Sequence, residues 1–126
     1  MSVYDTMFFM QYFYSNDARM LNRMRDMLRL DRKRHISAVV LHELYKLTIE
    51  KEGKEVADLR SSMLAKEFSL IPLNYDLAIA SAEIRHKYSI PMADSIIAAT
   101  AKSLKMTCVT DDPHIKAVKE VTTKWL

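Results

Sequence analysis

The sequence predicts a single α/β domain over residues 1–126, a three-layer α/β/α sandwich around a mostly parallel sheet of four to five strands. Short apolar runs alternate along the chain with longer segments of helical periodicity, which is the order that produces parallel strands. A chain of this length can bury one hydrophobic core. Apolar residues make up 49% of the chain, with one Gly and three Pro, a composition that excludes disordered and collagenous proteins.

The chain is expected to begin with a strand and two helices. Residues 2–5 form a short apolar strand, and the aromatic residues that follow recur at helical spacing, as expected for packing in a core or on a dimer surface. Residues 17–31 form a second helix, because their Met and Leu residues line one stripe. The run RHIS at residues 34–37 then forms a brief strand.

Two further helices, over about 38–52 and 54–67, are separated by Gly53, which suits the position after a helix C-terminus. The apolar run SLIPL at residues 69–73 is the next expected strand. Asn74 is a strong N-cap residue and predicts a helix that runs to about residue 88.

The C-terminal part of the chain repeats this alternation. Pro91 opens a helix that runs to about residue 105, because proline suits the first helical turn. The run MTCVT at residues 106–110 is the last clear strand, and the tail KEVTTKWL offers an edge strand.

Composition also bears on where the protein works. No basic region precedes the first apolar stretch, which contains Asp5, and no uncharged run approaches the ~18 residues of a membrane span. The single cysteine, Cys108, has no partner for an internal disulfide, as is usual in a reducing compartment. We therefore expect a cytoplasmic protein without a membrane segment.

A basic segment interrupts an otherwise balanced charge pattern. Between residues 19 and 34, seven Arg or Lys residues face only two acids. Such a segment could follow a phosphate backbone or dock an acidic protein. It could equally be the solvated face of a helix, and the sequence leaves both explanations open.

Four carboxylates occupy positions where a lone charge is costly. Asp5 and Asp112 lie at or just beyond the ends of predicted strands, and the carboxyl ends of parallel strands share one edge of the sheet. Glu43 borders the apolar stripe of its helix. Asp94 lies in the first turn of its helix, in register with inward-facing Ile and Ala residues.

Each acid also has a purely structural explanation. Asp112 before Pro113 is a strong N-cap, and Asp5 could cap the helix after the first strand. Asp94 could complement a helix dipole, and Glu43 could pair with Lys46. Taken together these explanations weaken, because close carboxylates repel by about 4 kcal/mol per pair at an effective dielectric near 20. Either some acids take up protons or a divalent cation binds, and an all-oxygen site favours Mg²⁺ or Mn²⁺ over zinc.

The order and spacing of several segments resemble the PIN domain, the nuclease family that includes the VapC toxins. The resemblance spans essentially the whole chain. It rests on VYDT at residues 3–6, SAVVLHEL at 37–44, and PMADSIIAATAKSLKMTCVTDD at 91–112. The last segment is the most specific, with an Asp that opens an Ile- and Ala-rich helix, then a strand and a Thr-x-Asp ending. The chain has Met7 and Ile115 where many relatives have a small polar and an aromatic residue.

The resemblance implies a metal-dependent endoribonuclease with an acidic pocket for one or two Mg²⁺ or Mn²⁺ ions. By motif position, Asp5 and Asp94 would be direct ligands, and Glu43 and Asp112 would complete the pocket directly or through water. Thr110 would orient a water or a carboxylate, and Asp111 is a neighbour that could substitute for Asp112. The implied partners are RNA, a second copy of the chain in a homodimer, and a small antitoxin protein.

Three functions remain open from the sequence. The first is a ribonuclease toxin of a VapBC-type toxin–antitoxin pair. The second is a PIN-family nuclease of RNA processing or quality control, and the third is a catalytically silent module that binds RNA or protein. His114 could contact a phosphate near Asp112 or be an ordinary surface histidine.

Overall fold

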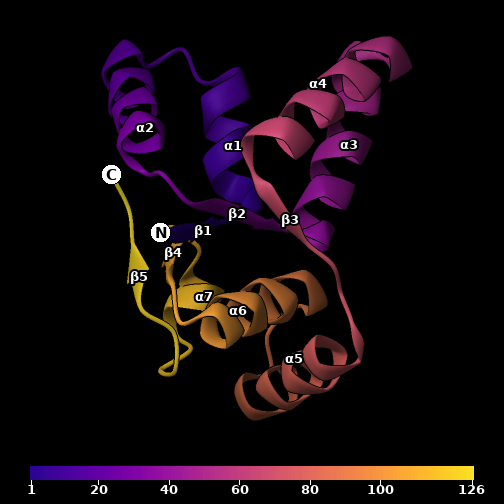
Figure 1. The fold of residues 1–126 in the computed structure, drawn as a ribbon, viewed down its shortest axis with the longest axis vertical. Helices are drawn as coiled ribbons and strands as arrows, with labels where there is room; N and C mark the ends of the chain where they lie inside the picture. Colours follow the sequence, from indigo (N-terminus) through magenta and orange to yellow (C-terminus); the bar gives the residue numbers. More distant parts are fainter.

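The computed structural model describes all of residues 1–126 and has the predicted α/β/α architecture, with helices on both faces of one sheet (Figure 1). The elements are, in chain order, β1 (Ser2–Tyr4), α1 (Thr6–Tyr14), α2 (Ala18–Leu30), β2 (Arg34–Ser37), α3 (Ala38–Glu52), α4 (Lys54–Glu67), β3 (Ser69–Ile71), α5 (Tyr75–Tyr88), α6 (Met92–Leu104), β4 (Thr107–Val109), α7 (Pro113–Lys116) and β5 (Thr123–Lys124).

The sheet is fully parallel and has the strand order β3-β2-β1-β4-β5. The chain moves outward from β1 to β3 and then returns to the other side of β1, where Val3 lies opposite Cys108 of β4. Parallel crossovers are right-handed, so this reversal places the later helices on the opposite face. Helices α1 to α4 accordingly lie on one side of the sheet, and α5 to α7 lie on the other (Figure 1). The reversal creates a switch point beside β1, where open α/β sheets form their sites.

Aromatic side chains fill the space between β1 and the first helical layer. The ring centroid of Tyr4 lies 4.9 Å from that of Phe8 and 5.5 Å from that of Phe68, both in edge-to-face geometry. Phe9 completes the group, 5.1 Å from Phe68. All four side chains are buried, so the predicted aromatic helix α1 packs into the core through Phe8 and Phe9.

Helix α6 is the most deeply buried helix and supports the other face of the sheet. Every residue from Ser95 to Ala101 is buried, and this stretch includes three alanines. Small side chains allow close approach of neighbouring backbones, and α6 contacts α5, β1, β2 and β4. The predicted inward face, with Ile97, Ala98 and Ala101, is confirmed.

The element boundaries differ from the prediction where one residue has a local reason to end a strand. Strand β1 ends at Tyr4 because Asp5 acts as the N-cap of α1. The run SLIPL pairs only as far as Ile71, since Pro72 has no N–H to donate to the ladder. Gly53 ends α3 with φ of +91°, a conformation that L side chains rarely adopt.

The basic segment is amphipathic. Met24 and Leu28 of α2 are buried, and the arginines of this helix are exposed. The segment ends in β2, where Arg34 lies opposite Ser2 at the amino edge of the parallel sheet. Its C-terminal end therefore lies at the edge opposite to the strand ends that carry Asp5 and Asp112.

No helix combines the length and apolar character that crossing a bilayer requires. Cys108 in β4 is fully buried, and this burial raises the pKa of its thiol. A thiol in this environment stays protonated and unreactive, which agrees with a structural role.

Candidate functional site

Two neighbouring strands deliver acidic residues to the same edge of the sheet. Asp5 follows β1 directly, and Thr110 follows β4, with Asp112 two residues further on. Because β1 and β4 are adjacent and parallel, their carboxyl ends meet. The expected convergence of Asp5 and Asp112 therefore follows from strand order alone.

Asp5 is a buried carboxylate, with 2% of its surface exposed, and the protein fixes both of its oxygens. Oδ1 accepts hydrogen bonds from the backbone N–H groups of Met7 and Phe8, so the predicted helix cap is confirmed. Oδ2 accepts a hydrogen bond from the hydroxyl of Thr110. Thr110 thus orients a carboxylate, which was one of the two roles expected of it.

Asp112 combines a capping role with a place in the acidic group. Its Oδ1 accepts the N–H of His114 at 2.7 Å, and Pro113 occupies the first position of α7, as predicted. Its own N–H donates to Thr110 Oγ1 at 3.0 Å. Thr110 therefore connects Asp5 to Asp112 across the ends of β1 and β4.

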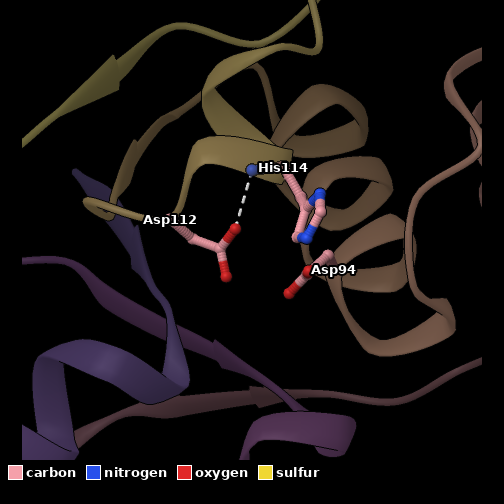
Figure 2. Close-up of side chains that lie close together, drawn as sticks. All are labelled: Asp94, Asp112 and His114. Carbon is pink, nitrogen blue, oxygen red and sulfur yellow. Dashed lines mark hydrogen bonds between the residues drawn. The ribbon is translucent and has the colours of Figure 1, made fainter.

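Asp94 reaches the same place from α6. It is half-buried in the first turn of that helix and caps nothing with its side chain. Ligand atoms of Asp94, Asp112 and His114 all lie within 4.8 Å of one another. Figure 2 shows the Asp94 carboxylate directly below the imidazole of His114, with the Asp112 carboxylate to its left.

Glu43 lies on α3, which contacts both α1 and α6. Its Oε1 accepts a hydrogen bond from Thr6 Oγ1 at 2.5 Å, so the residue after Asp5 orients a second acid. The proposed pairing with Lys46 is wrong, because Lys46 pairs with Glu50 at 2.6 Å. Glu43 is half-buried and retains no cationic partner.

Burial and like charge both act on this acidic group. Burial, followed by the negative charge of Asp112, raises the pKa of Asp94 to about 6. His114 opposes this rise, and Asp5 and Glu43 add to it. Burial also raises the pKa of Asp5, although the hydrogen bonds from Thr110 and the two amides oppose the rise. All four predicted acids therefore interact electrostatically at one site, and no lysine or arginine neutralises them.

Two residues close to Asp112 in the sequence, Asp111 and His114, lie differently from what the sequence suggested. Asp111 is exposed and pairs with Lys116 at 3.2 Å, so it does not share the position of Asp112. His114 joins Asp94 and Asp112, although the sequence suggested an all-oxygen site. The sequence signal for His114 was its position two residues after Asp112, with Pro113 between them, because a capped first helical turn holds these two residues close together.

A cleft of about 470 Å³ opens beside the acids. It lies between α1, α3 and the start of α6. Glu43 and its hydrogen-bond donor Thr6 both line the cleft, which therefore adjoins the acidic group. Met10, Val39 and Met92 supply apolar surface, and His42 and Lys46 supply polar groups. The cleft volume lies in the usual range of small-molecule sites.

Comparisons with known proteins agree with this geometry. The profile of the family described as PIN domain matches residues 3–121. A comparison with curated protein sequences gave no match.

Several solved structures share the fold of this chain. VapBC2 from Rickettsia felis aligns with a TM-score of 0.80 and 17% identity, over 99% of this chain and 98% of that chain. FitAcB from Neisseria gonorrhoeae aligns with a TM-score of 0.76 and 22% identity, over 98% and 96%. VapC20 from Mycobacterium tuberculosis aligns with a TM-score of 0.76 and 18% identity, over 94% and 95%. At these identities the likeness concerns the fold.

The raised pKa of Asp94 predicts that Asp94→Asn stabilises the metal-free protein at neutral pH. Between about pH 4 and 6 the folded state keeps a proton that the unfolded state has released, so stability falls as pH rises through this range. At pH 7.5 in EDTA, we expect the variant to gain on the order of 1 kcal/mol, since solvent screens a half-buried carboxylate. Chemical denaturation measures this gain.

The gain from Asp94→Asn should disappear near pH 4, where the aspartate is protonated in the folded state. Asp111→Asn is the matched control, because Asp111 is exposed and paired with Lys116. A variant at Asp94 that is less stable than the wild type at pH 7.5 would contradict the assigned repulsion.

The link through Thr110 predicts different outcomes for its two conservative substitutions. Thr110→Val removes the hydroxyl that donates to buried Asp5, and leaving such a group unpaired costs about 1–3 kcal/mol. Thr110→Ser keeps the hydroxyl and loses only a methyl group, worth about 0.8 kcal/mol. Urea denaturation at pH 7 should rank the wild type above Ser and Ser above Val, and equal losses would argue against the hydrogen bond as the cause.

Proposed function

Because the chain belongs to the PIN domain family, we propose that it is a metal-dependent endoribonuclease that acts as the toxin of a VapBC-type toxin–antitoxin pair. The observation that carries this proposal is the convergence of Asp5, Glu43, Asp94 and Asp112 at the switch point of the sheet. Burial and the negative charge of its acidic neighbours raise the pKa of Asp94, and His114 opposes this rise only in part. A divalent cation would offset the remaining negative charge.

The donor set fits a hard divalent cation. Asp94 and Asp112 offer oxygens to a common point, and Asp5 and Glu43 would complete the pocket directly or through water. Carboxylate oxygens are the ligands of Mg²⁺ and Mn²⁺. When bound, such an ion lowers the pKa of its water and stabilises the charge that develops on the phosphate.

The surrounding residues support this pocket in defined ways. Thr110 fixes Asp5, and Thr6 fixes Glu43, so hydroxyl groups hold two of the acids in place without neutralising them. The cleft beside Glu43 has room for a nucleotide, and its apolar surface suits a base. His42 and Lys46 on the same cleft would approach the phosphates.

RNA is the proposed substrate on two grounds. The family is one of nucleases, and one structural relative, VapC20, is a toxin that cleaves the sarcin-ricin loop. Another structure of the same fold is a toxin-antitoxin complex from Klebsiella pneumoniae. These relatives support RNA and an antitoxin as partners of the present chain. A homodimer is part of the proposal, and exposed Tyr75 and Ile79 on one face of α5 offer it an apolar surface.

An apolar groove on α4 is the proposed antitoxin site. It lies among α1, α2 and α4, encloses about 290 Å³ and is bordered by Arg60 and Glu67. Leu59 and Met63 are 65% and 51% exposed, one turn apart on α4. Burying a large apolar side chain contributes about 1.5–3 kcal/mol, so a partner segment that covers both would gain affinity. The groove is separate from the acidic site, which makes the two functions separable by substitution.

The central prediction is RNA cleavage that requires Mg²⁺ or Mn²⁺ and stops in EDTA. Asp94→Asn should lower the cleavage rate at least about 100-fold, because it removes charge that would hold the ion. Gel analysis of a mixed RNA pool, with Asp111→Asn as the exposed control, measures the effect. Cleavage that survives both EDTA and Asp94→Asn would contradict the metal mechanism. A protein that binds RNA but shows neither cleavage nor calorimetric Mn²⁺ binding would be a silent binding module.

The antitoxin assignment predicts a selective effect of Leu59→Asp. The charge should weaken binding of the copurifying small protein at least about tenfold and relieve its inhibition of cleavage, because the groove is apolar. Cleavage by the free variant should be unchanged. Leu30→Asp is the matched control, because Leu30 is 73% exposed and does not line the groove. Absence of any inhibitory partner would favour an RNA-processing nuclease.

A further inference from the structure

The imidazole of His114 approaches the acidic group from α7, an element that carries none of the four acids. Its imidazole extends from α7 towards the Asp94 carboxylate of α6, with Asp112 alongside (Figure 2). A ring nitrogen and one oxygen from each acid lie within 4.8 Å of one another. Metal–ligand bonds of about 2.0–2.2 Å place neighbouring ligands about 3–4 Å apart, so small side-chain rotations would bring these three atoms onto one cation.

The position of the imidazole is fixed by the turn that carries it. The backbone N–H of His114 donates to Asp112 Oδ1 at 2.7 Å, so the histidine and the acid are joined through the cap of α7. Pro113 restricts the backbone between them. Ile115 is fully buried, and α7 contacts α6, which anchors the next residue of the turn. The ring is therefore exposed to solvent but mounted on a rigid base.

The ring nitrogens are free to bind a ligand. The hydrogen bond of His114 is made by its backbone, and its side chain makes none within the protein. The nearby lysine, Lys116, is directed to Asp111 and does not compete for the site. The imidazole thus lies beside two carboxylates with its ring nitrogens unbonded, which is the arrangement that a metal ligand needs.

We propose that His114 supplies a nitrogen ligand to the cation held by Asp94 and Asp112. The inference rests on the proposed metal site and adds a preference to it. Mg²⁺ takes oxygen ligands and seldom gives up water for nitrogen, whereas imidazole binds first-row transition ions in the order Mn²⁺ < Fe²⁺ < Co²⁺ < Ni²⁺. The site of this chain therefore favours Mn²⁺ and later transition ions over Mg²⁺.

Pulsed electron paramagnetic resonance of the Mn²⁺-loaded full chain, without RNA, tests this assignment. A nitrogen bonded to Mn²⁺ produces a ¹⁴N modulation of the electron spin echo. We expect the modulation in the wild type and in His42→Gln, the control at the neighbouring cleft, and its loss in His114→Gln. Wild-type protein without ¹⁴N modulation, or His114→Gln that retains it, would overturn the inference.

Calorimetry supplies a second readout that is independent of catalysis. His114→Gln should weaken Mn²⁺ binding at least about tenfold and leave Mg²⁺ binding nearly unchanged. Equal losses for both ions would overturn the inference and assign His114 to an outer position. If the wild type binds Mn²⁺ and cleaves RNA but shows no ¹⁴N modulation, only this inference fails. If it binds neither ion, the proposed metal site fails as well.

Discussion

Mutual repulsion between half-buried carboxylates is the interaction on which the carboxyl edge of this sheet depends. Asp94 approaches Asp112 and His114 within 4.8 Å, and the pKa of Asp94 rises to about 6 because burial and its acidic neighbours oppose its charge. Two unit charges about 4 Å apart repel by about 4 kcal/mol at an effective dielectric near 20, and solvent around these half-buried groups reduces the net cost to on the order of 1 kcal/mol. A fold can maintain this arrangement only if the rest of the molecule holds the acids in position or a cation joins them.

The core provides that support on both faces of the sheet. On one face, Tyr4, Phe8 and Phe68 pack edge to face and fix the end of β1 that presents Asp5. On the other face, the buried stretch Ser95–Ala101 anchors α6 against the sheet, which fixes the first turn where Asp94 lies. Hydroxyl groups of Thr110 and Thr6 then orient Asp5 and Glu43 without cancelling their charge. Stability and site geometry thus come from the same packed elements.

Capping and ligation are compatible roles for the same carboxylate. Asp5 and Asp112 both cap helices, as their sequence positions suggested, and each still contributes to the electrostatics of the site. A cap uses one oxygen and fixes the side-chain rotamer, which leaves the other oxygen preoriented. In Asp112 the cap also carries the imidazole of His114 to the site. A structural explanation for an acid is therefore no argument against a functional one.

The sequence by itself determined the alternation of strands and helices, the caps at Asp5, Asn74 and Asp112, and the placement of acids at strand ends. These features follow from periodicity and from contacts between residues a few positions apart. Only the tertiary structure decided that Glu43 bonds Thr6 rather than pairing with Lys46, and that His114 joins Asp94. The same holds for the end of the basic segment, which lies at the opposite edge of the sheet. Such choices depend on which distant elements pack together, and the order of strands around β1 sets that packing.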